Sequence, residues 1–337
     1  MEAALWKRVG ELADRAPTIA DLRHHRLQLI ASSRMRARGE TPPATLRADE
    51  RRYAAAHVTA PVLLRRIRSL CDGRLVLMKG PELATRWPQA RQRPSGDIDL
   101  LADDAPAAHA ALVSAGFVML GDPNAYVGLH HLVPLALRGM PLTIEIHSRP
   151  HWPAGFVPGI DEIAEAATPS ALGIDGLLAP RPAHHAVLLA VHAWEHEPLG
   201  RVGSLADVAA MTEEADPVAV SAVARTWGVS RIWNTTARAV DELLSDAWRP
   251  VYWPIWKRHL RDARERTVFE HQVAQFSGPV ATAPPAHAPV VALHVLDRTL
   301  RRANDESWSA KLRRSLRAAR NASAPRSWHE AKLTEQP

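Results

Sequence analysis

The sequence has a single cysteine, Cys71, which excludes an internal disulfide framework and fits a reducing compartment. No apolar run approaches the roughly 20 residues that span a bilayer, so we expect no membrane partner. The stretch MEAALWKRVGELADR carries charges where a secretory signal peptide requires an apolar segment. These absences predict a cytoplasmic protein.

The chain is well supplied with apolar residues and with positive charge. It has 337 residues, of which 46% are hydrophobic, enough to build a core. The formal net charge is +6 and the sequence pI is near 10. A positive balance favours anionic partners, such as nucleotides, nucleic acid or an acidic peptide.

Residues 1–70 predict a helical N-terminal segment. Apolar residues recur at helical spacing in PTIADLRHHRLQLIASSRM and again in VTAPVLLRRIRSL, and GETPP at 39–43 separates the two stretches. Residues 71–170 differ in character and predict a catalytic domain with a mixed sheet. RLVLMKG is a short strand before a helix that Pro81 opens, DIDLLA is a second strand, and APAAHAALVSAGF is a helix that Gly116 closes.

A hairpin completes this middle region. HHLVPLAL and LTIEIH flank the turn-like tetrapeptide RGMP, which is typical of two antiparallel strands. After Pro150 the strand signals fade, and residues 171–275 predict a helical domain of four successive helices, the third ended by Gly228. Residues 276–337 predict a Pro/Ala-rich linker, SGPVATAPPAHAP, and a basic tail containing KLRRSLRAAR. The expected fold class is therefore α+β.

Two carboxylates lie one residue apart in the strand DIDLLA. Asp97 and Asp99 point to the same face, while Ile98 points into the core. Adjacent carboxylates repel unless a cation lies between them, and Mg²⁺ prefers such oxygen ligands. In LTIEIH the same alternation presents Glu145. If the two strands are neighbours, three carboxylates converge and could hold two metal ions for an in-line phosphoryl displacement.

These motifs together resemble a known superfamily. Strand-Lys79-Gly80-helix, then R-x-x-G-D-h-D-L-L from Arg93 (h is an apolar residue), then h-E-h-H, are similar to the polymerase β-like nucleotidyltransferases, closest to a branch of uncharacterised bacterial members. The resemblance implies that Asp97, Asp99 and Glu145 are the catalytic metal ligands. It also implies that the turn at Gly80 holds the triphosphate.

The turn departs from the superfamily pattern. Gly80 is followed by Pro81 where a serine is usual, so a phosphate-binding hydroxyl and one backbone N–H are missing. Lys79 and Arg93 are expected to compensate, with Gly96 beside them. The nucleotide-binding residues expected from this resemblance are Lys79, Gly80, Arg93 and Gly96.

Several histidines are candidates for the acceptor site. His192 and His196 lie at i, i+4 on one helical face, a spacing that can bind zinc, but the H-E-x-x-H order is absent. They either face the acceptor or pack within the helical domain. The acceptor-site candidates are His147, His192, His196 and Asp207. The pairs His130-His131 and His184-His185 are expected to be structural or exposed.

The sequence thus predicts a metal-dependent nucleotidyltransferase that moves NMP from an NTP, with ATP expected, to a small molecule, peptide or protein, releasing pyrophosphate. The cofactor is Mg²⁺ or Mn²⁺. The alternatives are a transferase directed to RNA such as tRNA, a metal-dependent hydrolase, and a non-catalytic nucleotide or peptide binder. An RNA partner is not favoured, because basic runs are most often solvated surface.

Overall fold

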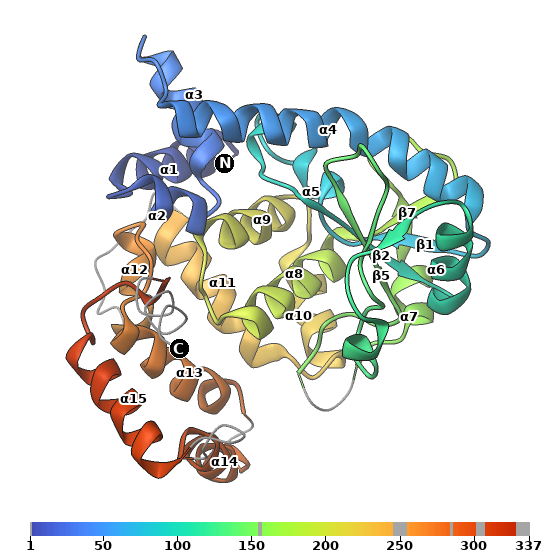
Figure 1. Ribbon diagram of the computed structural model, residues 1–337. Helices are drawn as coiled ribbons and strands as arrows, with labels where there is room; N and C mark the ends of the chain where they lie inside the picture. The colour runs from blue at the N-terminus through green and yellow to red at the C-terminus, as the bar shows by residue number, and fades with distance from the viewer. Residues whose placement is uncertain (1, 154–156, 245–254, 284–285, 301–306, 328–337) are drawn as a thin grey trace.

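A computed structural model of the chain describes residues 2–153, 157–244, 255–283, 286–300 and 307–327 (Figure 1). Its described strands form one seven-stranded sheet in the order β3-β4-β5-β2-β1-β7-β6. The strands are β1 (Leu75–Leu77), β2 (Asp97–Ala102), β3 (Val118–Met119), β4 (Leu135–Ala136), β5 (Thr143–His147), β6 (Ala167–Pro169) and β7 (Leu177–Pro180). Parallel pairs (β2 with β5, β1 with β7) alternate with antiparallel ones, which confirms a mixed α+β sheet.

The expected hairpin is present, because β4 pairs antiparallel with β5. The strand expected at DIDLLA is β2, which lies at the centre of the sheet and is buried along almost its whole length. Ile98 and Leu100 are fully buried on one face, where they join a core that also contains Leu64 and Ile67 of the long helix α4. The apolar residues of β2 therefore fix which face the acids occupy.

The helices that cover the sheet come from the parts of the chain before, between and after the strands. The N-terminal helices are α1 (Glu2–Arg15), α2 (Ile19–His24), α3 (Gln28–Ala37) and α4 (Ala44–Leu70). As expected, the segment GETPP separates α3 from α4, which runs along the sheet and packs against α6 (Figure 1). Within the sheet domain lie α5 (Pro81–Ala84), α6 (Ala105–Ser114) and α7 (Ile160–Glu165).

The four helices expected after Pro150 are confirmed. They are α8 (Pro182–His196), α9 (Val202–Glu213), α10 (Pro217–Thr226) and α11 (Ser230–Leu244). Gly228, with a φ of 68°, follows α10 as predicted. These helices share one core with α1 and with the second face of the sheet. No helix in the described part of the chain is long and apolar enough to cross a membrane.

The expectation that strands end near Pro150 is wrong. Strands β6 and β7 follow it, and β7 pairs in parallel with β1, so the sheet continues beyond residue 170. Both strands are short, and β7 reads LLAP, an apolar run without alternation. A run this short gives no periodicity from which a strand can be told from a loop or a helix.

The predicted linker is also wrong in part. Helix α13 (Val268–Thr282) includes residues 277–282, although it contains Gly278 and Pro279. Tertiary packing outweighs the low helix propensity, because Gly278 fits so closely against Pro198 that a Cβ there would lie 2.8 Å from its ring. Residues 284–285 of the linker lie outside the described residues.

The basic run of the tail is helical in the structure. It forms α15 (Trp308–Arg320), which follows α12 (Arg258–Arg261), α13 and α14 (Ala288–Leu300). The chain after α15 then returns to the start of α13, where Val268 N donates to Ala324 O and Arg326 N donates to Arg266 O, each at 3.0 Å. This return brings Arg326 toward the body of the protein.

Candidate active site

Strands β2 and β5 place the predicted acids side by side. The strands are parallel neighbours, and Asp99 lies directly opposite Glu145. Because side chains alternate between the faces of a strand, Asp97, Asp99 and Glu145 project from the same face of the sheet, opposite the buried Ile98. From the sequence, the three carboxylates were expected to converge only if the two strands are neighbours. The strands are neighbours, so the three side chains converge.

A lysine and a histidine contact the central carboxylate. Asp99 is fully buried, and Lys79 Nζ lies 2.8 Å from its Oδ1. His147 Nε2 lies 3.3 Å from the same oxygen and 3.5 Å from Glu145 Oε2. Lys79 comes from the end of β1 and His147 from the end of β5, so three adjacent strands build this centre.

The pKa values of the two aspartates shift in opposite directions. Burial, followed by the charge of Asp99, raises the pKa of Asp97. Burial would also raise the pKa of Asp99, but Lys79 and His147 hold it well below its usual range. Asp99 is therefore ionised at neutral pH, and a further cation near Asp97 would favour the ionised form that burial and Asp99 disfavour.

His147 is coupled to the carboxylates on either side. Contact with His147 lowers the pKa of Glu145. Burial disfavours a charged His147, yet its contacts with Asp99 and Glu145 raise its pKa overall. A positive charge between two carboxylates stabilises both, so a protonated His147 supplies that charge, and a metal ion bound here would take its place and use the neutral ring.

The acid group fits a divalent cation. One ligand atom from each of Asp99, Glu145 and His147 lies within 4.8 Å of the others. Asp99 Oδ2 is buried and accepts no hydrogen bond from any described residue, a costly situation that a bound cation would relieve. This close group contains His147 in place of the expected Asp97, although Asp97 faces the same cleft.

Gly80 has a packing role that the sequence does not reveal. Its φ is 65°, and a Cβ there would lie 2.6 Å from the carbonyl oxygen of Asp97, so only glycine fits where β1 approaches β2. Pro81 then begins a helix of only four residues. The cleft described below is lined by Lys79, while Gly80 and Gly96 are absent from its described lining.

Arg93 and Asp207 form a buried ion pair. Arg93 donates from Nε to Asp207 Oδ1 at 2.8 Å and from Nη2 to Asp207 Oδ2 at 2.9 Å. Its Nη1 donates to the carbonyl oxygen of Gly80 at 3.0 Å, and Trp87 Nε1 donates to Asp207 at 2.9 Å. The pair thus ties α9 to the turn that carries Lys79, which suits a positioning role better than the nucleotide and acceptor roles expected for these residues.

Histidines gather beside the acids. Six of them form a continuous group in which each ring centre lies within 6.2 Å of another. They are His130, His131, His147, His151, His192 and His196. Burial lowers the pKa of His196 to about 4, that of His130 to about 3, and that of His192 well below its usual value, so these three rings are neutral at neutral pH.

The two histidine pairs that were expected to be structural or exposed lie in different surroundings. His130 and His131 line the cleft rather than a remote surface. His185 is structural, as expected: it is fully buried and its Nε2 lies 2.6 Å from the carbonyl oxygen of Met78. His151, which follows β5, was not singled out from the sequence.

One cleft of about 440 Å³ brings these residues together. Of the residues expected from the sequence, its walls contain Lys79, Arg93, Asp97, Asp99, Glu145, His147, His192, His196 and Asp207. The walls also contain Arg201, the arginine of the looser resemblance over residues 180–235, and two arginines that the sequence did not indicate, Arg26 and Arg326. The acids, Lys79 and these arginines therefore line one space that is large enough for a small ligand.

A mixed sheet that presents paired acids to a cleft lined by both basic and acidic residues suits an enzyme that handles phosphates. Residues 14–245 match the model of a family described as uncharacterised nucleotidyltransferase. The chain belongs to this family, and it is a nucleotidyltransferase. No curated protein matches it significantly. The match ends near the end of α11, so α12 to α15, and with them Arg326, lie outside the matched region.

Proposed function

We propose that this enzyme transfers a nucleoside monophosphate from an NTP, with ATP as the expected donor, to a hydroxyl or phosphate of a small molecule, a peptide or a protein. The observation that carries the proposal is the convergence of Asp97, Asp99 and Glu145 with Lys79 at one cleft. The family match supports transfer to some acceptor and leaves its chemical class to experiment.

Asp97, Asp99 and Glu145 are proposed to hold Mg²⁺ or Mn²⁺, which would neutralise charge on the triphosphate when bound. His147, beside Asp99 and Glu145, keeps both carboxylates ionised. Lys79, oriented by Asp99, directs its ammonium group at a phosphate oxygen. Catalysis on this scheme is mostly positioning and charge neutralisation.

The transfer itself is a displacement at the α-phosphorus. An acceptor oxygen forms the new P–O bond while the bond to pyrophosphate breaks, and pyrophosphate leaves with the bonding electrons. Glu145, half-buried and with a lowered pKa, is ionised and is proposed to receive the acceptor proton. His192 and His196, neutral in the same cleft, are proposed to hydrogen-bond the acceptor.

Pyrophosphate release on mixing the enzyme with NTP, Mg²⁺ and candidate acceptors tests this function. Mass spectrometry of the acceptors should show a gain equal to one NMP. Gain of a phosphoryl group alone, or hydrolysis of the NTP without a modified acceptor, would contradict nucleotidyl transfer.

Lys79→Ala should weaken NTP binding by about 1.5 to 3 kcal/mol, because it removes one charge-assisted contact. Isothermal titration with a non-hydrolysable NTP measures the dissociation constant. Lys7→Ala, an exposed lysine on α1, is the matched control and should leave it unchanged. An unchanged dissociation constant for Lys79→Ala would mean that the triphosphate binds at another wall of the cleft. Arg201→Ala would then be the next variant to measure.

Arg326→Ala should raise the KM for the anionic substrate about fivefold, a loss of roughly 1 kcal/mol that suits a partly exposed charge. Arg326 lines the cleft, and its Nη1 lies 3.6 Å from Glu197 Oε1. Steady-state kinetics with Arg320→Ala, an exposed arginine at the end of α15, provides the control. Equal KM values for both variants would mean that the returning tail contributes only to the fold.

A further inference from the structure

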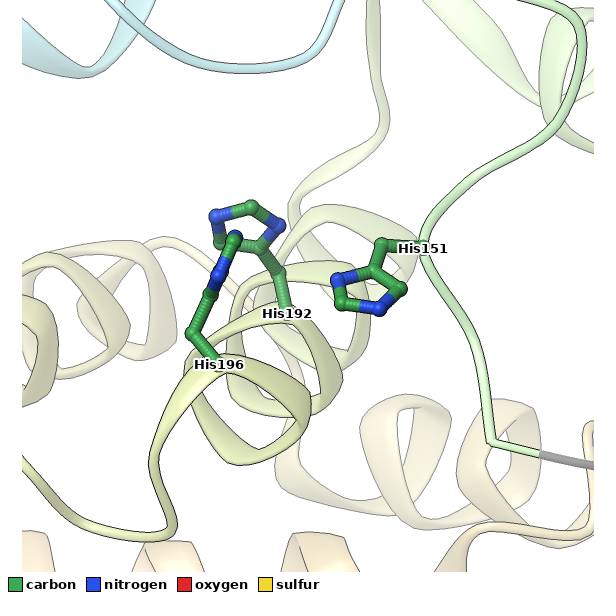
Figure 2. A group of neighbouring side chains, drawn as sticks. All are labelled: His151, His192 and His196. Atoms are coloured by element: carbon green, nitrogen blue, oxygen red, sulfur yellow. The ribbon is translucent and has the colours of Figure 1, made fainter. Parts of the chain in front are cut away.

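Three histidines, two of which are proposed above to contact the acceptor, form a close group of their own. His192 and His196 lie one turn apart on α8, and His151 approaches them from the segment that follows β5 (Figure 2). One ring nitrogen from each lies within 4.8 Å of the others. Two helical histidines at i, i+4 joined by a third from a distant segment are the ligand arrangement of many zinc sites.

The surroundings hold this group in place. The ring of His130 stacks on His151, with centres 4.3 Å apart and planes 3° from parallel. His151 Nδ1 is buried and has no hydrogen-bond partner among the described residues. A small cavity of about 20 Å³, lined by His151 and His192 together with Lys79, adjoins the main cleft. One histidine nitrogen thus lacks a partner beside a space large enough for a water or an ion.

The contact with Lys79 shows how His192 is oriented. Lys79 Nζ lies 2.9 Å from His192 Nε2. Lys79 Nζ also lies 3.4 Å from Nδ1 of the same ring, and an ammonium group only donates hydrogen bonds, so His192 accepts from it through the lone pair of one ring nitrogen. Zinc would take the same lone pair, and the Lys79 ammonium would keep its partner Asp99, whose Oδ1 lies 2.8 Å away.

We propose that His151, His192 and His196 bind a transition-metal ion, zinc above all, at a site separate from the magnesium site of the carboxylates. Imidazole nitrogen suits zinc, whereas Mg²⁺ prefers oxygen ligands, so the two sites select different ions. Three protein ligands leave a fourth position of a tetrahedral ion open to water or to an acceptor atom. His192 and His196 line the main cleft, so the ion would lie in that cleft, near Lys79.

Zinc binding by the full-length, chelator-stripped enzyme, without any nucleotide, tests the proposal. Competition with a chromophoric chelator should give one zinc ion per chain. His196→Ala, His192→Ala and His151→Ala should each weaken the affinity at least tenfold, since even the loss of an outer partner of a ligand costs about 10- to 100-fold. Cobalt(II) in place of zinc should show the visible absorption of a tetrahedral ion.

His57→Ala is the matched control, because His57 is exposed on α4 and distant in sequence from the group. It should bind zinc as the parent does. His196 is itself exposed, so its alanine variant should fold normally, which circular dichroism of the metal-free protein checks.

Zinc affinity unchanged in all three histidine variants would overturn the proposal. Loss of zinc in Glu145→Gln with retention in His196→Ala would also overturn it, by placing the ion at the carboxylates. Neither result depends on nucleotide transfer. The zinc site could therefore be correct even if the proposed function is wrong. The proposed function could likewise be correct even if no zinc binds.

Discussion

Asp97→Asn and Asp99→Asn should each lower the rate of nucleotidyl transfer by roughly 1,000-fold. Each change removes a negative charge from the group proposed to hold the metal, and a metal ion contributes several kcal/mol of charge stabilisation, with each 1.36 kcal/mol equal to a tenfold change in rate. Pyrophosphate release at saturating Mg²⁺ measures the effect. Asp103→Asn, just beyond β2 and paired with Arg74, is the matched control and should keep the parent rate.

The two variants should differ in stability even though both lose activity. Asp97→Asn removes a carboxylate that burial and Asp99 already disfavour, so the free energy of unfolding should stay level or rise. Asp99→Asn should lower it, because Lys79 and His147 lose a charged partner. Transfer within about tenfold of the parent for both variants would show that these acids are not the catalytic metal ligands.

The centre of the sheet was predictable because its pattern is local. In DIDLLA and LTIEIH, polar and apolar residues alternate with the period of a strand, so the side chains of Asp97, Asp99 and Glu145 could be assigned to one face before their neighbours were known. The parallel pairing of β2 with β5 could only be supposed from the sequence. It determines which carboxylates meet, and the structure places Asp99 opposite Glu145.

The rest of the site could not be predicted because it depends on long-range contacts. Arg93 and Asp207 are separated by 114 positions, and no local pattern shows that they pair. His151 lies in a segment without periodicity, and only the fold places it beside the two histidines of α8. Arg326 reaches the cleft because the chain returns along α13 after α15, a path that the composition of a basic tail does not specify.

The close packing at Gly80 is a further feature that the sequence could not show. A glycine after a strand and before a helix fits a phosphate-binding turn, and the sequence offers no means to exclude that interpretation. In the structure the same glycine allows β1 to approach the Asp97 carbonyl, and the helix after it is too short to concentrate a dipole on an anion. We therefore propose that phosphate binding at this end of the cleft depends chiefly on Lys79.

Asp207→Ala should lower the free energy of unfolding by about 3 to 5 kcal/mol, the usual cost of leaving one member of a buried ion pair without its partner. Arg93 would keep only the Gly80 carbonyl as an acceptor among the contacts described, and Trp87 would lose the acceptor of its indole N–H. Urea denaturation followed by circular dichroism measures the change. Asp72→Ala, which alters an exposed residue of the loop before β1, should stay within about 0.5 kcal/mol of the parent.

A double variant separates the cost of leaving one buried charge unpaired from the effect of losing the whole ion pair. Arg93→Leu combined with Asp207→Leu removes both charges, so it should cost less than Asp207→Ala alone, because no charge is then left buried. Since the pair holds α9 against the turn that carries Lys79, the double variant should still bind NTP more weakly than the parent even where its stability is recovered. A loss of under about 1 kcal/mol for Asp207→Ala would contradict this account, and it would leave Arg93 free for the nucleotide-binding role that the sequence predicted.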